Sequence, residues 1–438
     1  MTKGTYQLAS SRHHRRARRI VPRAAAAAMA PGGPLPECCS RKKRPPPALL
    51  QELVEEILLR IPPDDPATLL RASLVCKSWC KAVSNGWFRR TLHQLHPSPT
   101  ALGLLHDWHD EAIPTFIPAT ASPFSLAVPD RLLWRAVDCR HGRALFLSKP
   151  KYPAKELLVW EPITGDQLRV PLPVAFQFGH TTSAVVCAAD GCNHHDCHGG
   201  PFCVLFLFSV YNEDPDDQFD TSACVYSSET GAWGEPTSMR DTFIVDFDNY
   251  SSVLVGRSLL YFMTDGGFIL EYDLARHRLA WFDTPDSCHD KGWPTCILML
   301  AEDGGLGLVE ELDPHLQLWS RDAVDARWVP GRIICLQSLS LNGAPCPVHV
   351  LGFAEGANVI FATTAAGLFA IQVRSGKATR VCDDHGYGKL IPIVGLYTPM
   401  PRGQRSRKFP PASGYQHLRI GSATSLEEVR EGIFESCC

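Results

Sequence analysis

A hairpin pattern recurs five times along the chain and constrains the fold more than any other feature of the sequence. Each copy has a short alternating apolar segment, a polar turn and a second such segment. The copies occupy residues 157–170, 223–236, 268–282, 316–329 and 368–381. Each copy places a large apolar residue shortly before its turn: Trp160, Tyr226, Tyr272, Trp319 and Ile371. These residues are 66, 46, 47 and 52 positions apart. A period of about 40–50 residues with several strands per unit is typical of a β-propeller.

The two ends of this region complete the pattern. Residues 101–118 and 389–397 could together form a sixth unit, which would close the ring and remove its exposed edge strands. We therefore predict a propeller-like domain of kelch or WD type over residues 100–400, with about six blades. A β-sandwich is the alternative, because it also uses short strands but need not show this period.

The segment 45–96 has a helical pattern instead. Six apolar residues recur at spacings of three and four between the prolines at 45–47 and 62–63: Leu50, Leu53, Val54, Ile57, Leu58 and Ile61. A second helix is expected from Pro66, capped by Asp64 or Asp65, and a third short helix within residues 85–96. Three short helices make a small core, so we expect some apolar side chains to meet a partner. Packing on the downstream domain is the alternative.

The residues of this block match a known motif at close spacing. They are Leu49, Leu53, Glu56, Ile57, Leu58, Arg60, Ile61, Pro62, Leu70, Arg71, Ala72, Val75, Cys76, Lys77, Trp79 and Phe88. The block resembles the F-box, by which substrate receptors attach to a Skp-type adaptor in Skp–cullin–F-box ubiquitin ligases. The fold class expected is thus α+β multidomain, a short three-helix F-box followed by an all-β propeller-like domain.

The resemblance implies an adaptor-binding surface. Its residues would be shared between that interface and the block's own core: Leu49, Leu53, Ile57, Leu58, Pro62, Leu70, Val75, Cys76 and Trp79. Trp79 is the leading hot-spot hypothesis, and a purely internal role is its alternative. The function implied is a non-catalytic substrate-recognition subunit, linking the adaptor, and through it a cullin, to a target protein that the sequence does not identify.

A second resemblance lies at the start of the hairpin region. The segment VDCRHGRALFL (137–147) is followed by LVWEPITGDQLRVPLP (158–173). Together they resemble the propeller-like domain associated with the F-box in many plant receptors. This resemblance implies a binding platform and names no ligand.

Candidate metal and catalytic residues are few. Cys192, His194, His195, Cys197 and His198 have zinc-ligand chemistry, but a structural zinc site normally pairs two more widely separated clusters. We therefore predict a polar loop there, a solvated acidic loop at 213–217, no metal and no cofactor. No nucleophile or phosphate-loop motif occurs. The competing hypothesis is an enzyme or small-molecule sensor, which predicts converging titratable residues at one mouth of the propeller.

Charge separates the N-terminal segment from the rest of the chain. Residues 1–44 hold eleven Lys and Arg residues against one Glu, whereas the whole chain has a net charge of −3. We expect a disordered basic tail at 1–44, with nuclear-import patches at 13–19 and 41–44 or an organelle transit peptide as alternatives. A tail with a possible short helix is expected at 401–438. The acidic body argues against nucleic-acid binding.

Two features of the sequence bear on the cellular location of the protein: the length of its apolar runs and its cysteine content. No apolar run of about 18 residues occurs, which argues against a membrane span. The 17 cysteines are scattered and odd in number, which favours reduced thiols and a nuclear or cytoplasmic protein.

Overall fold

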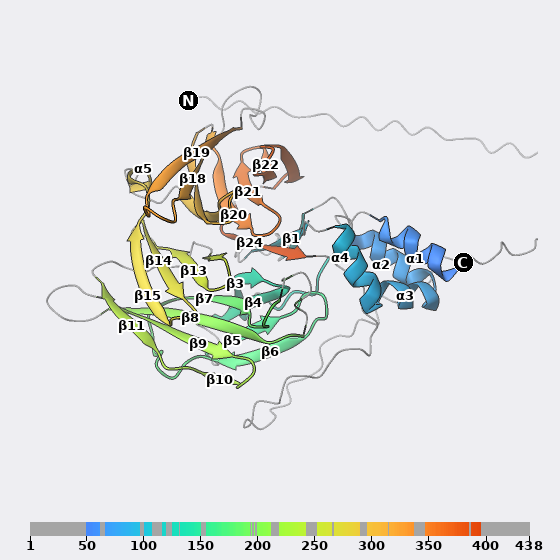
Figure 1. Ribbon diagram of the computed structural model, residues 1–438, viewed down its shortest axis with the longest axis horizontal. Helices are drawn as coiled ribbons and strands as arrows, with labels where there is room; N and C mark the ends of the chain where they lie inside the picture. Colours follow the sequence, from blue (N-terminus) through green and yellow to red (C-terminus); the bar gives the residue numbers. More distant parts are fainter. Residues whose placement is uncertain are drawn as a thin grey trace, which may run out of the picture. The chain divides into compact units, whose positions relative to one another are not determined.

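The computed structural model describes residues 50–61, 66–96, 100–106, 116–119, 125–130, 132–149, 155–192, 194, 197, 199–211, 219–241, 252–264, 267–289, 296–313, 315–336, 347–384 and 387–395. Within these ranges the chain forms a block of short helices and then a series of antiparallel sheets (Figure 1). Among the residues described, no helix combines the length and the apolar character needed to cross a bilayer. The predicted tails at 1–44 and 401–438 lie outside these ranges.

The helical block contains α1 (Gln51–Leu59), α2 (Pro66–Val75), α3 (Lys77–Val83) and α4 (Gly86–Leu95). The second predicted helix is divided at Cys76, whose extended backbone (φ −162°, ψ 165°) separates α2 from α3. Asn85 caps α4 by accepting a hydrogen bond from the Trp87 N–H at 3.0 Å. The core of the block contains Val54, Leu58, Leu59, Leu69, Ala72, Ala82, Val83, Phe88 and Leu92.

The rest of the described chain forms six sheets, which we number as blades. Blade 1 contains β24 (Leu390–Gly395), β1 (Thr100–His106) and β2 (Phe116–Pro118). Blade 2 contains β3 (Trp134–Arg140), β4 (Arg143–Ser148), β5 (Glu156–Trp160) and β6 (Gln167–Pro171). Blade 3 contains β7 (His180–Cys187), β8 (Phe202–Tyr211), β9 (Phe219–Ser227), β10 (Ala232–Trp233) and β11 (Thr237–Asp241).

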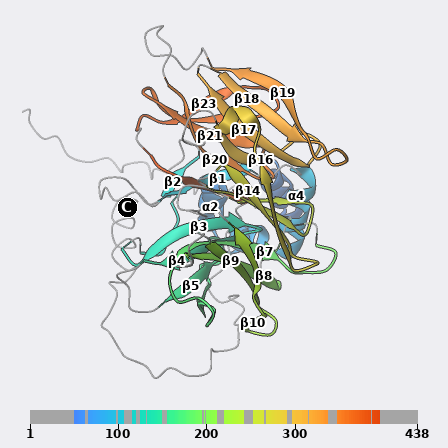
Figure 2. The same ribbon diagram turned by 90° about the vertical axis from the view of Figure 1, so that its left-hand side faces the viewer.

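Blade 4 contains β12 (Ser252–Val255), β13 (Leu259–Met263), β14 (Phe268–Asp273) and β15 (Arg278–Asp283). Blade 5 contains β16 (Cys296–Leu300), β17 (Leu306–Leu312), β18 (His315–Arg321) and β19 (Trp328–Cys335), and α5 (Asp286–His289) precedes it. Blade 6 contains β20 (His349–Ala354), β21 (Val359–Thr364), β22 (Gly367–Gln372) and β23 (Ala378–Cys382). Figure 2 shows the sheets from a second side.

The two ends of the propeller sequence meet in blade 1. β1 pairs antiparallel with β24, from Thr100 opposite Gly395 to His106 opposite Leu390. This pairing confirms the sixth unit expected from the chain ends. The inner strands then contact one another around the ring, β24 with β3 and β20, β3 with β7, and β16 with β12 and β20. The arrangement is a six-bladed propeller and not the alternative sandwich.

The apolar core lies between the blades. Each of six buried clusters joins two neighbouring blades, and together they run round the ring. Blades 3 and 4, for example, share a cluster that contains Leu205, Leu260 and Phe262. The five predicted landmark residues all lie on the third strand of a blade, and all but the half-buried Trp319 are buried. The repeat in the sequence is therefore the repeat of one layer of this core.

The five hairpin turns also share a backbone conformation. In each turn one residue has a positive φ: Gly165 (74°), Gly231 (68°), His277 (50°), Ala326 (54°) and Gly376 (68°). Each follows the first residue of its turn by four positions, and at Gly165, Gly231, Ala326 and Gly376 the N–H donates to the carbonyl of that residue. Glycine suits this left-handed conformation, whereas His277 and Ala326 adopt it at a cost.

Candidate functional site

The first helix of the block has more apolar surface than its core covers. Val54 and Leu58 are buried, whereas Leu53 and Ile57 are 45 % and 50 % exposed. Leu50 extends the exposed stripe by one turn, because residues 50, 53 and 57 fall on one helix face. We call Leu50, Leu53 and Ile57 the α1 stripe.

A second exposed apolar group lies where α2 ends. Val75 is 63 % exposed, and Leu74 and Cys76 beside it are also exposed. The Ser78 hydroxyl donates to the Gln51 side chain at 2.6 Å, which joins the start of α3 to the start of α1. The break at Cys76 and the α1 stripe are thus held at neighbouring parts of the block.

The structure sorts the predicted adaptor residues into two groups. Leu53, Ile57, Val75 and Cys76 are exposed, as a binding surface requires. Leu58 is buried in the core, Trp79 is half-buried against it, and Leu70 is half-buried.

Two of the predicted adaptor-binding residues are not described by the structure, and two exposed apolar residues were not predicted. Leu49 and Pro62 lie outside the described residues. Sequence reasoning left out Leu50 and Leu74, although the spacing of Leu50 already placed it on the apolar face.

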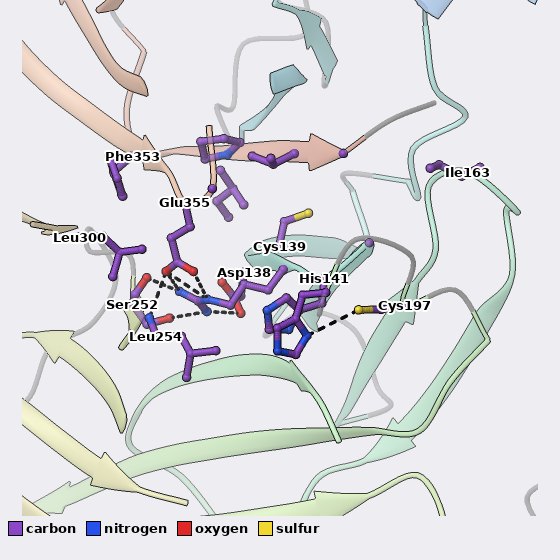
Figure 3. Close-up of a pocket in the computed structure, with 18 of the residues that line it drawn as sticks. Asp138, Cys139, His141, Ile163, Cys197, Ser252, Leu254, Leu300, Phe353 and Glu355 are labelled. Carbon is purple, nitrogen blue, oxygen red and sulfur yellow. Dashed lines mark hydrogen bonds and ion pairs between the residues drawn. The ribbon is translucent and has the colours of Figure 1, made fainter. Parts of the chain in front are cut away.

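The centre of the propeller holds a cavity of about 430 Å³. The ends of the inner strands β3, β12, β16, β20 and β24 contribute to its lining, so these ends meet at one mouth of the channel. Figure 3 shows Asp138, Ser252 and Glu355 pointing toward the same part of this cavity. Converging charged groups at a propeller mouth are what the enzyme hypothesis predicted.

Arg140 lies at the centre of these groups and its donors are all engaged. Its Nε and Nη2 donate to the two carboxylate oxygens of Glu355, with Nη2–Oε1 at 2.7 Å and Nε–Oε2 at 3.0 Å. Its Nη1 donates to Asp138 Oδ2 at 2.7 Å and to the Ser252 hydroxyl at 3.0 Å, and Nη2 also donates to the Ser252 carbonyl. No N–H of this guanidinium is left to bind a substrate.

The two carboxylates are engaged as well. Asp138 accepts from the Val185 N–H at 2.8 Å, and Glu355 accepts from the Leu254 N–H at 3.1 Å. Burial would lower the pKa of Arg140, but the charges of Asp138 and Glu355 outweigh it, and the net pKa is raised above its ordinary value. The network ties blades 2, 3, 4 and 6 together, and each of its three charged groups makes several hydrogen bonds. Its geometry is that of a structural brace.

The connection between β7 and β8 brings four potential metal ligands together. The ligand atoms of Cys187, Cys192, His194 and Cys197 all lie within 4.8 Å of one another. The sequence singled out Cys192, His194 and Cys197 but missed Cys187, which lies at the end of a strand and outside the short motif. His195, His198 and the acidic residues 213–217 lie outside the described residues.

Comparison with known families bears on both parts of the chain. Residues 48–91 match the profile of the F-box domain. Residues 135–400 match the family described as F-box protein AT5G49610-like, β-propeller. The chain is an F-box protein of the AT5G49610-like β-propeller family. The F-box and the propeller expected from the sequence are thereby confirmed. No curated protein matches this F-box protein.

Solved structures similar to the F-box protein are distant. A functionally unknown protein from Desulfotomaculum acetoxidans shares 9 % identity at a TM-score of 0.33, covering 60 % of this chain and 76 % of that one. A protein of unknown function from Bacteroides caccae shares 12 % identity at a TM-score of 0.36, and the match covers 59 % of this chain and 87 % of that one. The Cps50 (Swd1) β-propeller domain of Myceliophteria thermophila shares 11 % identity at a TM-score of 0.30, and the match covers 56 % of this chain and 72 % of that one. These scores are too low for the three proteins to bear on function.

Proposed function

We propose that this F-box protein is a non-catalytic substrate receptor of a Skp–cullin–F-box ubiquitin ligase. Its F-box would bind a Skp-type adaptor, and through it a cullin, while the propeller binds the target protein. Ubiquitin transfer would then be carried out by partners, with this chain supplying proximity. A nuclear or cytoplasmic location stays a prediction.

The observation that carries the proposal is the α1 stripe. Fully burying a Leu or Ile side chain is worth about 1.5–3 kcal/mol relative to leaving it in water. Three such residues lie over the N-cap and the first two turns of α1, and Val75 is exposed on the same block, so the block presents apolar surface that its own core does not cover. A partner helix or groove of apolar character fits such a surface.

The test is binding to a purified Skp-type adaptor. Because Ile57 is half exposed, Ile57→Asp should leave the helical core intact while placing a charge in the interface. We expect the Kd to rise at least about tenfold, the equivalent of about 1.4 kcal/mol. Val324→Asp is the matched control, because Val324 is exposed in a propeller turn. Equal binding by both variants and the unaltered protein would reject the proposed contact surface.

The topology of the propeller favours one end for target binding. Thr100 pairs with Gly395 at the mouth of the channel, and α4 ends only a few residues earlier, at Leu95. The F-box is therefore joined to the propeller at this mouth. At the opposite end, the segment between β6 and β7 exposes Val174 (98 %) and Phe178 (67 %). We propose that this end contacts the target.

Proximity labelling in cells with an inhibited proteasome tests this assignment. Val174→Asp combined with Phe178→Asp should remove a subset of labelled proteins without reducing recovery of the adaptor. An unchanged set of labelled proteins would place the target elsewhere on the propeller.

A further inference from the structure

The connection between β7 and β8 folds into a cluster of three thiols and one imidazole. Cys187 is the last residue of β7, and Cys192, His194 and Cys197 follow it before β8 begins at Phe202. Cys192 Sγ lies 3.5 Å from Cys197 Sγ, and Cys197 Sγ lies 3.6 Å from His194 Nδ1. Cys197 is buried and the other three residues are half-buried. We propose that these four residues bind a structural zinc ion.

The distances fit a tetrahedral site. With Zn–S near 2.3 Å and Zn–N near 2.0 Å, a tetrahedron has S–S edges of about 3.8 Å and S–N edges of about 3.5 Å. The observed separations of 3.5 Å and 3.6 Å lie within a few tenths of an ångström of these values, and no pair of ligand atoms exceeds 4.8 Å. Three thiolates and one imidazole are a ligand set that selects zinc over harder cations such as Mg²⁺ and Ca²⁺.

Three described residues of the connection have a left-handed backbone conformation. Gly191, His194 and Gly199 have positive φ angles of 64°, 61° and 67°. For His194 this conformation is uncommon and needs an interaction that holds it. The His194 N–H also donates to Cys192 Sγ at 3.4 Å, the kind of bond that stabilises a thiolate ligand. The connection has little apolar content of its own, so a metal would supply the order that a core cannot.

Side chains from two other blades hold the ligands in place. Arg143 Nη2 donates to the Cys197 carbonyl at 2.8 Å, and Arg257 Nη2 donates to the Cys192 carbonyl at 2.7 Å. The Cys187 N–H donates to His141 Nδ1 at 3.0 Å, and the His141 ring stacks on His194 at 4.0 Å. Supporting contacts of this kind orient metal ligands.

Charge and coordination also agree with a structural role. A zinc ion with three thiolates carries a net charge of −1, which the nearby guanidinium group of Arg257 complements, whereas Arg143 is already paired with the buried Glu161. Four protein ligands close the tetrahedron and leave no position for a substrate, as in structural sites. The ion would fix the β7–β8 connection at the channel mouth, since His141, His194 and Cys197 also line the cavity.

The first test is the metal content of the full chain, purified under reducing conditions without chelator. We expect about one zinc ion per chain, and fewer than about 0.1 in Cys192→Ser and Cys197→Ser. Cys335→Ser is the matched control, because Cys335 is an exposed thiol outside the cluster. Unaltered protein without zinc, or a Cys197→Ser variant that keeps its full zinc content, would overturn the proposal.

A second test uses only the unaltered chain and so does not depend on a variant folding. Exchange of the ion for Co²⁺ should produce the strong visible absorption of a tetrahedral thiolate site. Chelation should lower the melting temperature, and added zinc should restore it, because the binding free energy adds to stability. No cobalt spectrum, or a Cys192–Cys197 disulfide in place of a metal under reducing conditions, would contradict the site.

Discussion

Arg140 on β3 and Glu355 beyond β20 form a two-pronged ion pair across the channel of the propeller, with Nη2–Oε1 at 2.7 Å and Nε–Oε2 at 3.0 Å. Arg140 is almost fully buried, and blades 2 and 6 that carry the pair are far apart in the sequence. Removing one partner of a buried pair leaves an uncompensated charge, so Arg140→Met should reduce the free energy of unfolding by about 3–5 kcal/mol.

Denaturant unfolding measures this loss. Arg240→Met is the control, because Arg240 makes an exposed ion pair with Asp220 that should contribute less than about 1 kcal/mol. If the two variants lost equal stability, Arg140 would not brace the ring.

Two adjacent residues of α1 should affect different properties of the F-box, one its folding stability and the other its binding to the adaptor. Leu58 is buried in the helical core, so Leu58→Ala should reduce F-box stability by about 2–5 kcal/mol. Ile57 is half exposed, so Ile57→Ala should change stability by less than about 1 kcal/mol and weaken adaptor binding instead. Thermal unfolding and adaptor titration of both variants measure the difference. If Ile57→Ala reduced stability as much as Leu58→Ala, Ile57 would belong to the helical core and the α1 stripe would not be a binding surface.

The positive-φ position of the hairpin turns should respond in opposite ways in two blades. Gly231 has a φ of 68° and a Cβ there would meet no atom, so Gly231→Ala should cost about 1 kcal/mol through the backbone alone. Ala326 already bears that strain at a φ of 54°. Ala326→Gly should relieve it and raise stability by up to about 1 kcal/mol, after the extra chain entropy of glycine. The melting temperatures of both variants test these two predictions. A Gly231→Ala variant that is more stable than the unaltered protein would contradict the proposed backbone cost.

Stability should depend on pH through Asp273 at the start of the blade 4 turn. A bond from the Arg276 side chain, together with the N–H groups of Ala275 and Arg276, holds the pKa of Asp273 below its ordinary value. A lowered pKa in the folded state means that the stabilisation is present above the unfolded value of about 3.9 and is lost as the pH falls through the folded value.

Asp273→Ala should therefore be less stable than the unaltered protein at neutral pH, and the gap should narrow below about pH 4. Asp273→Asn keeps an oxygen that can accept from the turn and should lose less. Unfolding curves at several pH values measure the gap. A gap that stays constant down to pH 2 would exclude the carboxylate as its source.

Closure of the ring should be sensitive to one glycine. A Cβ at Gly352 on β20 would lie 2.4 Å from the Leu390 carbonyl of β24, so Gly352→Ala forces the two inner strands apart. We expect a loss of about 1–3 kcal/mol. Gly395 at the end of β24 has open space around its Cβ position, so Gly395→Ala is the control. Equal melting temperatures for the two variants would show that this contact does not limit closure.

Much of the architecture followed from periodicity in the sequence. The landmark residues from Trp160 to Ile371 repeat because each occupies the same strand of a blade, where one inter-blade layer needs a large side chain. The joining of β1 with β24 was also predictable, because a propeller with unpaired end strands would expose its edges. Proline positions and apolar spacing likewise predicted a helix over the residues of α1, and a third short helix was expected where α4 lies.

The division between core and surface was decided by the tertiary structure. Leu53, Ile57 and Leu58 belong to one apolar pattern, and only packing against the other helices shows that Leu58 is buried while Leu53 and Ile57 face outward. The helix break at Cys76 was likewise decided by the tertiary structure, since no proline or glycine near this position in the sequence predicts it.

The clusters of charged and metal-ligating residues depended on the fold most of all. Asp138 and Glu355 meet at Arg140 only because ring closure brings blades 2 and 6 to one channel. Cys187 joins Cys192 and Cys197 only because the chain curls back after β7. Local spacing therefore determined the elements and their repeat, since these depend on neighbours along the chain. The contacts between distant side chains were fixed by the packing of the closed ring, and no local pattern specifies which side chains meet there.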